Sequence, residues 1–313
     1  MIRRIVKKTL GLLFRSLPPI RREVARGLTV FTFHEVTDSP SLFARQYCLA
    51  VSTATFRRQA TWIKQNFNVI HPRDLTNGNA IPERAAIISL DDGFLGAFQH
   101  GLPVLEELGL PSIIFLNMMP VLEQKPMLSA KACYLENVPA FLDFAQAIGL
   151  KRPFHLTLSP AVMQDFENRH GSVDHSSVLA YQGPFADMET LKAWDGKEHI
   201  AYGNHLFQHW NACALNSEQF EQQYAENEKA LALFKSRVNL FAFTNGQPGT
   251  CWTERDVALL RGLGAVRIFS SAGGINRNPA DYVLDRLSLT ENDDDESHLW
   301  FRVGRPALRK LRG

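Results

Sequence analysis

The chain has 313 residues, 45% of them hydrophobic, and a formal net charge of +2 from 34 Lys and Arg against 32 Asp and Glu. This composition supports a sizeable core and excludes global disorder, and the nearly balanced charge argues against a nucleic-acid-binding protein. No C-x-x-C pair occurs among the scattered cysteines, so the sequence predicts reduced thiols rather than a zinc site or a disulfide framework: Cys48, Cys133, Cys213 and Cys251.

Residues 1–27 form a basic arm in which Lys and Arg far outnumber the single acidic residue, Glu23. Its apolar residues are spaced to form one side of an amphipathic helix: Ile2, Ile5, Leu12, Leu13 and Phe14. Two interpretations stay open: the arm binds a membrane surface, or it is a solvated or domain-packed segment. A secretory signal is not expected, because the apolar run is short and Arg15 closes it. No run is long enough to span a bilayer.

Strands and helices alternate after the arm. Four runs in this half have the apolar character of strands: residues 28–36, 69–70, 85–90 and 112–117. A helix is expected from a cap at Ser52 or Thr53, and a second helix is expected to end at Gly109.

The same alternation returns near the C-terminus. Asn216, with Gln219 in the capping-box position, predicts the start of a helix, and another helix is expected to end at Gly264. Residues 239–243 and 265–271 read as strands. Strands and helices in this rhythm indicate βαβ units and therefore a parallel sheet or barrel.

Residues 118–200 interrupt the alternation with repeated prolines, and only a helix at about 139–149 stands out. We interpret this stretch as an insertion on one domain that spans residues 28–313, not as a separate domain.

Polar residues end three of the expected strands. His34 and Glu35 come directly after "FTF", residues 31–33, in the first strand-like run. Asp91 and Asp92 follow the strand at 85–90, and "TNG", residues 244–246, follows the strand at 239–243. In parallel α/β folds the functional groups collect at these carboxyl ends. An aspartate pair before a glycine is also a common turn or helix cap, and His34 could simply be a hydrogen-bonded residue at a strand end.

His205 and His209 form an H-x-x-x-H pair, a spacing that places both imidazoles on one side of a helical turn. Two His and one carboxylate leave an open position on a divalent ion, which suits catalysis. Such a pair also arises by chance. A cation would explain why two aspartates stand side by side, because one would be neutralised as a ligand while the other stays free as a base. Alternation along an extended backbone would point their side chains to different sides.

These motifs together resemble the polysaccharide deacetylase family, the NodB-homology domain. "SLDDG", residues 89–93, and "GNHLFQH", residues 203–209, are similar to its two metal-site motifs, and "FAFTNGQPG", residues 241–249, resembles a segment that usually reads F-A-Y-P-x-G. "FTFHEV", residues 31–36, resembles the start of the branch that includes poly-N-acetylglucosamine deacetylases. The resemblance covers roughly residues 28–290.

The resemblance implies an α/β fold, an irregular (β/α) barrel with fewer than eight strands and an inserted segment. It implies that Asp92, His205 and His209 bind a divalent metal, with zinc expected. Asp91 would be the general base that activates water, and His34 the general acid for the leaving amine. The implied enzyme is a hydrolase that removes the N-acetyl group from an amino sugar in a glycan or glycan precursor.

Three residues depart from the family pattern or extend it. Thr244 replaces the usual proline, which bears on the shape of the acetyl pocket. Arg286 could orient Asp91, but the sequence favours a surface salt bridge. Trp210 could stack on a sugar or pack in the core.

The expected partner is an N-acetylated amino-sugar glycan or a lipid-linked precursor, with peripheral membrane contact through the arm and no nucleic acid. The expected location is the cytoplasm, at the inner membrane surface. Two alternatives stay open, a hydrolase of another amide or imide and a non-catalytic glycan-binding relative. The intact set of two Asp and two His residues speaks against the second, since a binder does not need a base beside the metal ligands: Asp91, Asp92, His205 and His209.

Overall fold

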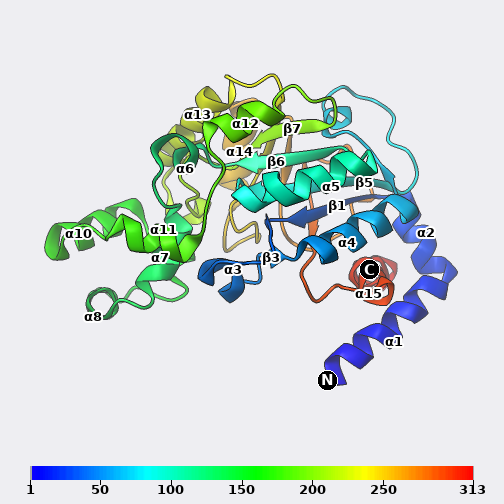
Figure 1. Cartoon of the computed structure of the whole chain (residues 1–313), viewed down its shortest axis with the longest axis horizontal. Coiled ribbons are helices and arrows are strands. Elements are labelled where there is room, and N and C mark those ends of the chain that lie inside the picture. The colour runs from blue at the N-terminus through cyan, green and yellow to red at the C-terminus, as the bar shows by residue number, and fades with distance from the viewer. Residues whose placement is uncertain (1, 313) are drawn as a thin grey trace.

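The computed structural model describes residues 2–312, and the side chains of residues 4–311. Met1 and the side chain of Ile2, both included in the expected arm, lie outside the described part. The rest of the chain forms an α/β fold with one central sheet (Figure 1).

The central sheet has nine strands, all parallel, in the order β10-β9-β8-β7-β6-β5-β1-β11, with β4 paired to β5. Its strands are β1 (Leu28–Phe33), β4 (Asn68–Val69), β5 (Ala85–Asp92), β6 (Ser112–Leu116), β7 (Ile200–Asn204), β8 (Arg237–Ala242), β9 (Arg267–Phe269), β10 (Val283–Leu284) and β11 (Arg286–Ser288). A small second sheet pairs β2 (Glu35–Val36) with β3 (Ala50–Val51).

The sheet closes on itself almost completely. Strands β10 and β11 lie at its two ends in the pairing order, yet only Asp285 separates them in the chain. The two edges must therefore meet at this residue, which makes the sheet a barrel. The irregular barrel is confirmed, and fewer than eight strands form its closed path, because β10 and β11 are two parts of one extended segment and β4 pairs with β5 outside that path.

Both faces of the strands are buried. One set of alternate residues fills the barrel interior, including Val30, Ile87 and Phe115, and the other set packs under the helices, including Phe31 and Ile88. This two-sided burial explains why the strands carry few charges. By the same alternation Asp91 continues the inward-facing row of Ile87.

Helices cover the outside of the barrel, and their ends follow the signals in the sequence. Ser52 caps α4 (Thr53–Asn66) by accepting from the Thr55 amide, and Asn216 and Gln219 form a capping box on α13 (Ser217–Leu231). The other core-facing helices are α3 (Leu42–Gln46), α5 (Leu102–Leu108) and α14 (Glu254–Gly262), and short helical turns occur at η1 (Pro72–Leu75), η2 (Ala97–Gly101) and η3 (Ala212–Ala214).

The stretch between β6 and β7 is helical, and most of it projects to the left of the barrel in Figure 1, while its last helix returns to lie beside β7. Its helices are α6 (Met118–Glu123), α7 (Leu128–Leu135), α8 (Pro139–Ala147), α9 (Phe154–Thr157), α10 (Pro160–His170), α11 (His175–Gln182) and α12 (Met188–Trp194). The helix expected at 139–149 is α8. A hydrophobic cluster around Phe141 and Phe154 joins these helices to the barrel.

The N-terminal arm folds as α1 (Ile2–Ser16) and α2 (Pro18–Arg26), and both helices pack against the C-terminal helix α15 (Glu296–Arg312). Phe14 is buried and stacks on Phe301. A Cβ on Gly11 would meet the backbone oxygen of Ser297 at 1.7 Å, so glycine is needed where the two helices cross.

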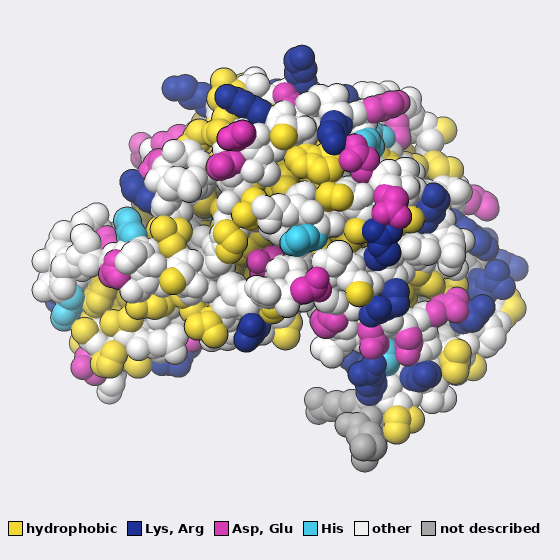
Figure 2. All heavy atoms as spheres, in the orientation of Figure 1, with side chains coloured by type: hydrophobic (Ala, Val, Ile, Leu, Met, Phe, Trp, Pro, Cys, Tyr) yellow, Lys and Arg dark blue, Asp and Glu magenta, His cyan; other side chains and the backbone are white. Residues whose placement is uncertain are grey.

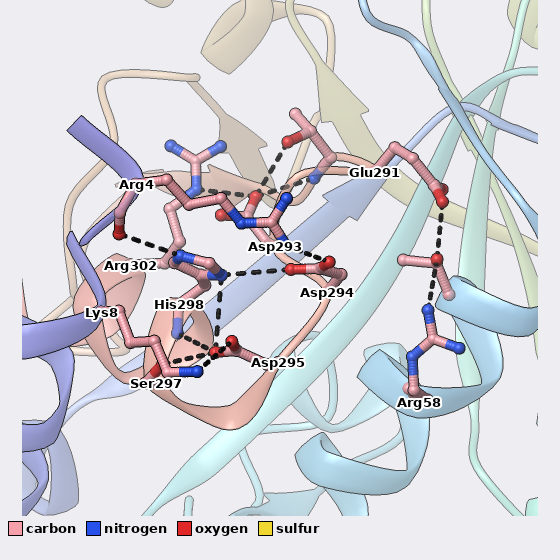
Figure 3. Close-up of polar contacts among 12 residues, drawn as sticks. Arg4, Lys8, Arg58, Glu291, Asp293, Asp294, Asp295, Ser297, His298 and Arg302 are labelled. Atoms are coloured by element: carbon pink, nitrogen blue, oxygen red, sulfur yellow. Dashed lines mark hydrogen bonds and ion pairs between the residues drawn. The ribbon is translucent and has the colours of Figure 1, made fainter. Parts of the chain in front are cut away.

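Ion pairs hold this corner together, as Figure 3 shows. Arg4 pairs with Asp294, and Lys8 lies 3.7 Å from Asp295. Asp294, Asp295 and His298 could together ligate a metal by geometry alone. However, the His298 ring already contacts Asp294 and the Arg4 carbonyl oxygen. In Figure 2, positive and negative side chains intermingle over this corner. The side chains of this cluster therefore already have partners, and the cluster serves as a contact between α1 and the start of α15.

The other side of α1 faces away from the domain and is apolar. Its exposed residues are Ile5, Val6, Leu12 and Leu13. Across the described residues, no helix combines the length and the hydropathy needed to cross a bilayer.

Candidate active site

A cavity of about 320 Å³ opens where β1, β5, β7, β8 and β9 end. It is lined by every site residue expected from the sequence: His34, Asp91, Asp92, His205 and His209. Parallel strands bring these residues together from distant parts of the chain, because their carboxyl ends share one edge of the barrel.

Asp92, His205 and His209 form a compact, buried group whose ligand atoms lie within 4.8 Å of one another. The Oδ1 atom of Asp92 is 3.1 Å from His209 Nε2 and 3.4 Å from His205 Nε2. Burial by itself would raise the pKa of Asp92, but the two imidazoles outweigh burial and hold this pKa well below its usual range.

The donor set suits a divalent cation. Asp92 Oδ1 is buried without a hydrogen-bond partner, which is costly for a carboxylate unless a cation satisfies it. His205 Nδ1 lies 2.7 Å from the Ala242 carbonyl oxygen, so Nδ1 carries the proton and Nε2 has its lone pair free toward Asp92. The residues present therefore fit a metal ion held by two imidazoles and one carboxylate.

The H-x-x-x-H pair does not lie on a helical turn, and that expectation was wrong. Residues 205–211 form a loop after β7, and both Leu206 and His209 have positive φ values of about 60°. These left-handed residues turn the loop so that His209 returns beside His205, with ring centroids 5.0 Å apart.

Buried asparagine side chains hold this loop, and no motif in the sequence indicated them. Asn117 donates to the carbonyl oxygens of His205 and Leu206. Asn204 accepts from the Leu206 amide and from Asn227, whose side chain also accepts from the Met118 amide. Because the side-chain NH2 group of each asparagine donates to a backbone oxygen of another element, the network holds the start of the loop at His205.

Two residues that departed from the family pattern, or extended it, have structural roles. The Thr244 hydroxyl donates to the Trp210 carbonyl oxygen, which ties the end of β8 to the loop next to His209. Trp210 is buried in the hydrophobic cluster and is absent from the cavity wall, so it packs in the core rather than stacking on a sugar.

Asp91 is held by a buried arginine. Arg286 Nη1 lies 2.7 Å from Asp91 Oδ1, and the guanidinium also donates to the Ser270 carbonyl oxygen and the Ser271 hydroxyl. Arg286 is only 2% exposed, so the expected surface salt bridge was wrong. Strand β11 pairs with β1 and places Arg286 opposite Val30 on the interior side of the barrel.

The two aspartates do not differ through alternation of an extended strand, as the sequence suggested. Asp92 has a φ of 73°, so the backbone leaves the extended conformation there and the Asp92 side chain also faces the cavity. Asp91 Oδ2 lies 3.9 Å from His205 Nε2, close to the same group. Their surroundings distinguish them, because Arg286 holds Asp91 whereas Asp92 Oδ1 faces the two imidazoles without a hydrogen-bond partner.

His34 stands on the other side of Asp91, with its Nε2 atom 4.0 Å from Asp91 Oδ2. Its side chain is partly exposed to the cavity. Burial lowers the pKa of His34 below its usual value, although Asp92 and Asp91 act in the opposite direction. His34 is thus placed to meet a group that enters the cavity beside Asp91.

The outer wall of the cavity is largely uncharged and comes from segments whose role the sequence did not reveal. Tyr47 follows α3, Cys133 lies on α7 and His155 on α9. Cys133 Sγ lies 3.6 Å from His155 Nδ1. Burial lowers the pKa of His155 to about 4, so this imidazole is neutral at physiological pH.

Comparison with solved structures identifies the fold. The chain aligns with a deacetylase from Streptococcus pyogenes, PplD, at a TM-score of 0.59 and 10% identity, over 88% of this chain and 98% of that one. It aligns with IcaB from Ammonifex degensii at 0.58 and 17% identity, over 88% and 97% of the two chains. The fold is that of the polysaccharide deacetylases.

Two further comparisons bear on this polysaccharide deacetylase fold. A de-N-acetylase from Aggregatibacter actinomycetemcomitans aligns at a TM-score of 0.57 and 14% identity, over 87% of this chain and 98% of that one. Among curated sequences, the poly-beta-1,6-N-acetyl-D-glucosamine N-deacetylase of Escherichia coli K12 is 25% identical over 92 residues. That match covers 28% of this chain and only 13% of the curated protein. No family model matches the chain.

Proposed function

We propose that this protein is a metal-dependent hydrolase that removes the N-acetyl group from an amino sugar. The observation that carries the proposal is the pairing of a buried Asp-His-His group with a second carboxylate, Asp91, fixed by Arg286 in the same cavity. Deacetylase names among the structural and sequence neighbours support the same reaction.

Asp92, His205 and His209 would hold the metal, and two histidines with one carboxylate favour zinc. When bound, such an ion supplies a Lewis acid and lowers the pKa of water. The residues of the chain supply the proton transfers. Asp91, held by Arg286, accepts a proton from the attacking water.

His34 lies across from Asp91, where the nitrogen of the acetamide would stand. An amine leaves a tetrahedral carbon only after it gains a proton. His34 would donate it as the imidazolium, which its lowered pKa makes a stronger acid although less of it is present at neutral pH. The neutral outer wall around Tyr47 and His155 accepts an uncharged sugar ring and excludes bulk water from the reacting carbon.

The N-terminal arm supports a location at a membrane surface. The apolar side of α1, with Leu12 and Leu13, faces away from the domain, and α2 carries the exposed cations Arg21, Arg22 and Arg26. An exposed apolar stripe next to basic residues is typical of helices that lie in an anionic membrane surface. We propose that the enzyme works at the inner membrane surface on a glycan or a lipid-linked precursor.

The test is acetate release from a panel of N-acetylated amino-sugar glycans by the zinc-loaded, full-length protein. Acetate release that a chelator abolishes and zinc restores supports the proposal. Hydrolysis of non-sugar amides alone would favour the alternative amidase, and glycan binding without any release would favour a binding protein.

A further inference from the structure

A second hollow adjoins the catalytic cavity on the side of α15. It has a volume of about 240 Å³ and shares three lining residues with the cavity: Ser271, Arg286 and Ser288. Its opposite wall carries Arg302, Arg305 and Arg309, and we call this hollow the arginine cleft.

The three arginines lie on one side of α15, because their spacing of three and four residues corresponds to successive turns of a helix. Arg302 is held in place, because its Nε donates to Asp293 at 3.0 Å (Figure 3). Its Nη2 also donates to the Ser288 carbonyl oxygen at 2.7 Å. Arg305 and Arg309 are exposed at the rim. The lining of the cleft contains no Asp or Glu, so its charge is positive.

The wall facing the arginines includes the small residues Ala272 and Gly273. Gly273 has a φ of 78°, and a Cβ added there would meet nothing within 4 Å. The loop around it therefore leaves room for a ligand between the backbone and the guanidinium groups. Planar guanidinium groups bind phosphate oxygens with two parallel hydrogen bonds, which makes arginine the favoured residue at phosphate sites.

We propose that the arginine cleft binds a phosphate or diphosphate carried by the acetylated sugar, so that the substrate is a phosphate-linked amino sugar. This inference rests on the proposed deacetylase function. In a 2-acetamido sugar, the amide and the anomeric oxygen stand on neighbouring ring carbons. A phosphate on that oxygen therefore lies beside the reacting amide, as the arginine cleft lies beside the catalytic cavity.

The charges around the two hollows favour a substrate that carries its negative charge only on the side of the arginine cleft. The outer wall of the catalytic cavity is formed by uncharged residues such as Phe43, Tyr47 and Leu156. An internal unit of a neutral polymer would leave the cationic cleft without a partner. Phe301 lines the cleft and also stacks on Phe14 of α1, so the cleft lies next to the helix that would rest on a membrane.

The first experiment compares three substrates of the zinc-loaded, full-length protein. They are polyprenyl-diphosphate-linked N-acetylglucosamine, UDP-N-acetylglucosamine and a neutral N-acetylglucosamine oligomer. We expect kcat/KM for at least one phosphate-linked sugar to exceed that of the oligomer by about 10-fold or more, as two guanidinium–phosphate pairs would provide. Which of the two is preferred identifies the lipid or the nucleotide as the source of the phosphate.

Variants then test whether the arginines of the cleft cause the preference for phosphate-linked sugars. Arg305→Ala with Arg309→Ala should lower the ratio of phosphate-linked to neutral turnover by about 10-fold, and the double Lys variant should restore part of it, because charge remains without the planar fork. Lys192→Ala with Lys229→Ala removes the same charge from exposed positions on α12 and α13 and should keep the ratio. An unchanged ratio in the double alanine variant overturns the inference.

A binding measurement separates this inference from the proposed function. Inorganic pyrophosphate is titrated into the zinc-loaded protein by calorimetry, and the double alanine variant should weaken its binding by about 10-fold or more. Pyrophosphate that binds both proteins equally occupies the catalytic cavity, and that result counts against the cleft. If no substrate releases acetate, the proposed function fails, while the pyrophosphate result still decides the cleft.

Discussion

Arg286 and Asp91 form a buried ion pair at 2.7 Å although 195 residues separate them in the chain. Closure of the barrel by β11 makes this contact, since β11 pairs with β1 and β1 pairs with β5. The general base and its orienting cation therefore depend on the same strand pairing that completes the fold.

Arg286→Lys should lower kcat by about 10- to 100-fold with little change in KM, the usual cost of losing an outer-shell partner. Lysine keeps the charge but cannot reach Asp91, the Ser270 carbonyl and the Ser271 hydroxyl at once. The measurement is steady-state kinetics together with zinc content, which should stay at the wild-type level. In an Asp91→Asn background, Arg286→Gln should cost little more, because the arginine acts through Asp91. If the losses in rate of the two substitutions were fully additive, the arginine would not act through Asp91.

Substitution of the two aspartates by asparagine should have different effects on metal binding and on rate. Asp92→Asn should weaken metal affinity by about 10-fold or more, because Asp92 Oδ1 faces both imidazoles. Asp91→Asn should keep its metal but lose about 10²- to 10⁴-fold in rate, as expected when a general base is removed. Metal content and turnover of both variants decide the assignment. A metal-free Asp91→Asn beside a loaded Asp92→Asn would reverse the roles.

Zinc should bind at the cavity and not at the second geometric candidate, Asp294, Asp295 and His298. His205→Ala should abolish stoichiometric zinc binding in calorimetry, because it removes a ligand whose orientation the Ala242 carbonyl fixes. His298→Ala is the matched control and should retain one zinc per chain. Loss of zinc in the His298 variant alone would move the site to α15.

Glu35 should make the protein less stable as the pH rises. Burial raises the pKa of this carboxyl from 4.5 to about 7, and its Oε2 atom has no hydrogen-bond partner. The folded state therefore holds the proton more tightly than the unfolded state. Its stabilising contribution is fully present below pH 4.5 and is lost as the pH rises through 7.

Glu35→Gln removes this dependence. Between pH 4.5 and pH 8 the free energy of unfolding of the variant, relative to wild type, should rise by up to about 3 kcal/mol, the value of the 2.5-unit difference in pKa. Denaturant unfolding at the two pH values measures it. Exposed Glu83→Gln serves as the control and should show no such change. A constant difference between Glu35→Gln and wild type across this range would refute the prediction.

The apolar side of α1 should bind anionic vesicles. Leu12→Gln with Leu13→Gln should reduce binding about 10-fold or more, because both side chains are exposed on that side and would enter the acyl boundary. Vesicle sedimentation with anionic and with neutral lipids measures it, using the full-length protein. Leu233→Gln, an exposed leucine in the segment after α13, is the control. Equal sedimentation of the wild type and the double variant would remove the membrane from the proposal.

Local signals in the sequence predicted most elements of the barrel. Ser52 and Asn216 start helices because their side chains accept from backbone amides within one turn, an interaction that needs no tertiary context. The charge-free strand before Asp91 reflects burial on both faces, which any parallel barrel imposes. The candidate site could be assembled from short motifs for the same reason, since strand ends converge at one edge.

Only the tertiary structure decided where several side chains point. The sequence around Arg286 suggests a surface residue, but the pairing of β11 with β1 places its side chain inside the barrel. The two histidines come together because Leu206 and His209 have positive φ values, which the H-x-x-x-H spacing does not predict. The same holds for the outer wall and for the arginine cleft, whose members come from distant segments. The sequence by itself determined the strands, the caps and the chemical types of the site residues, because these depend on near neighbours. The contacts of Arg286, the path of the histidine loop and the packing of α1 on α15 depend on chain closure over long separations, and such contacts exist only once the barrel has formed.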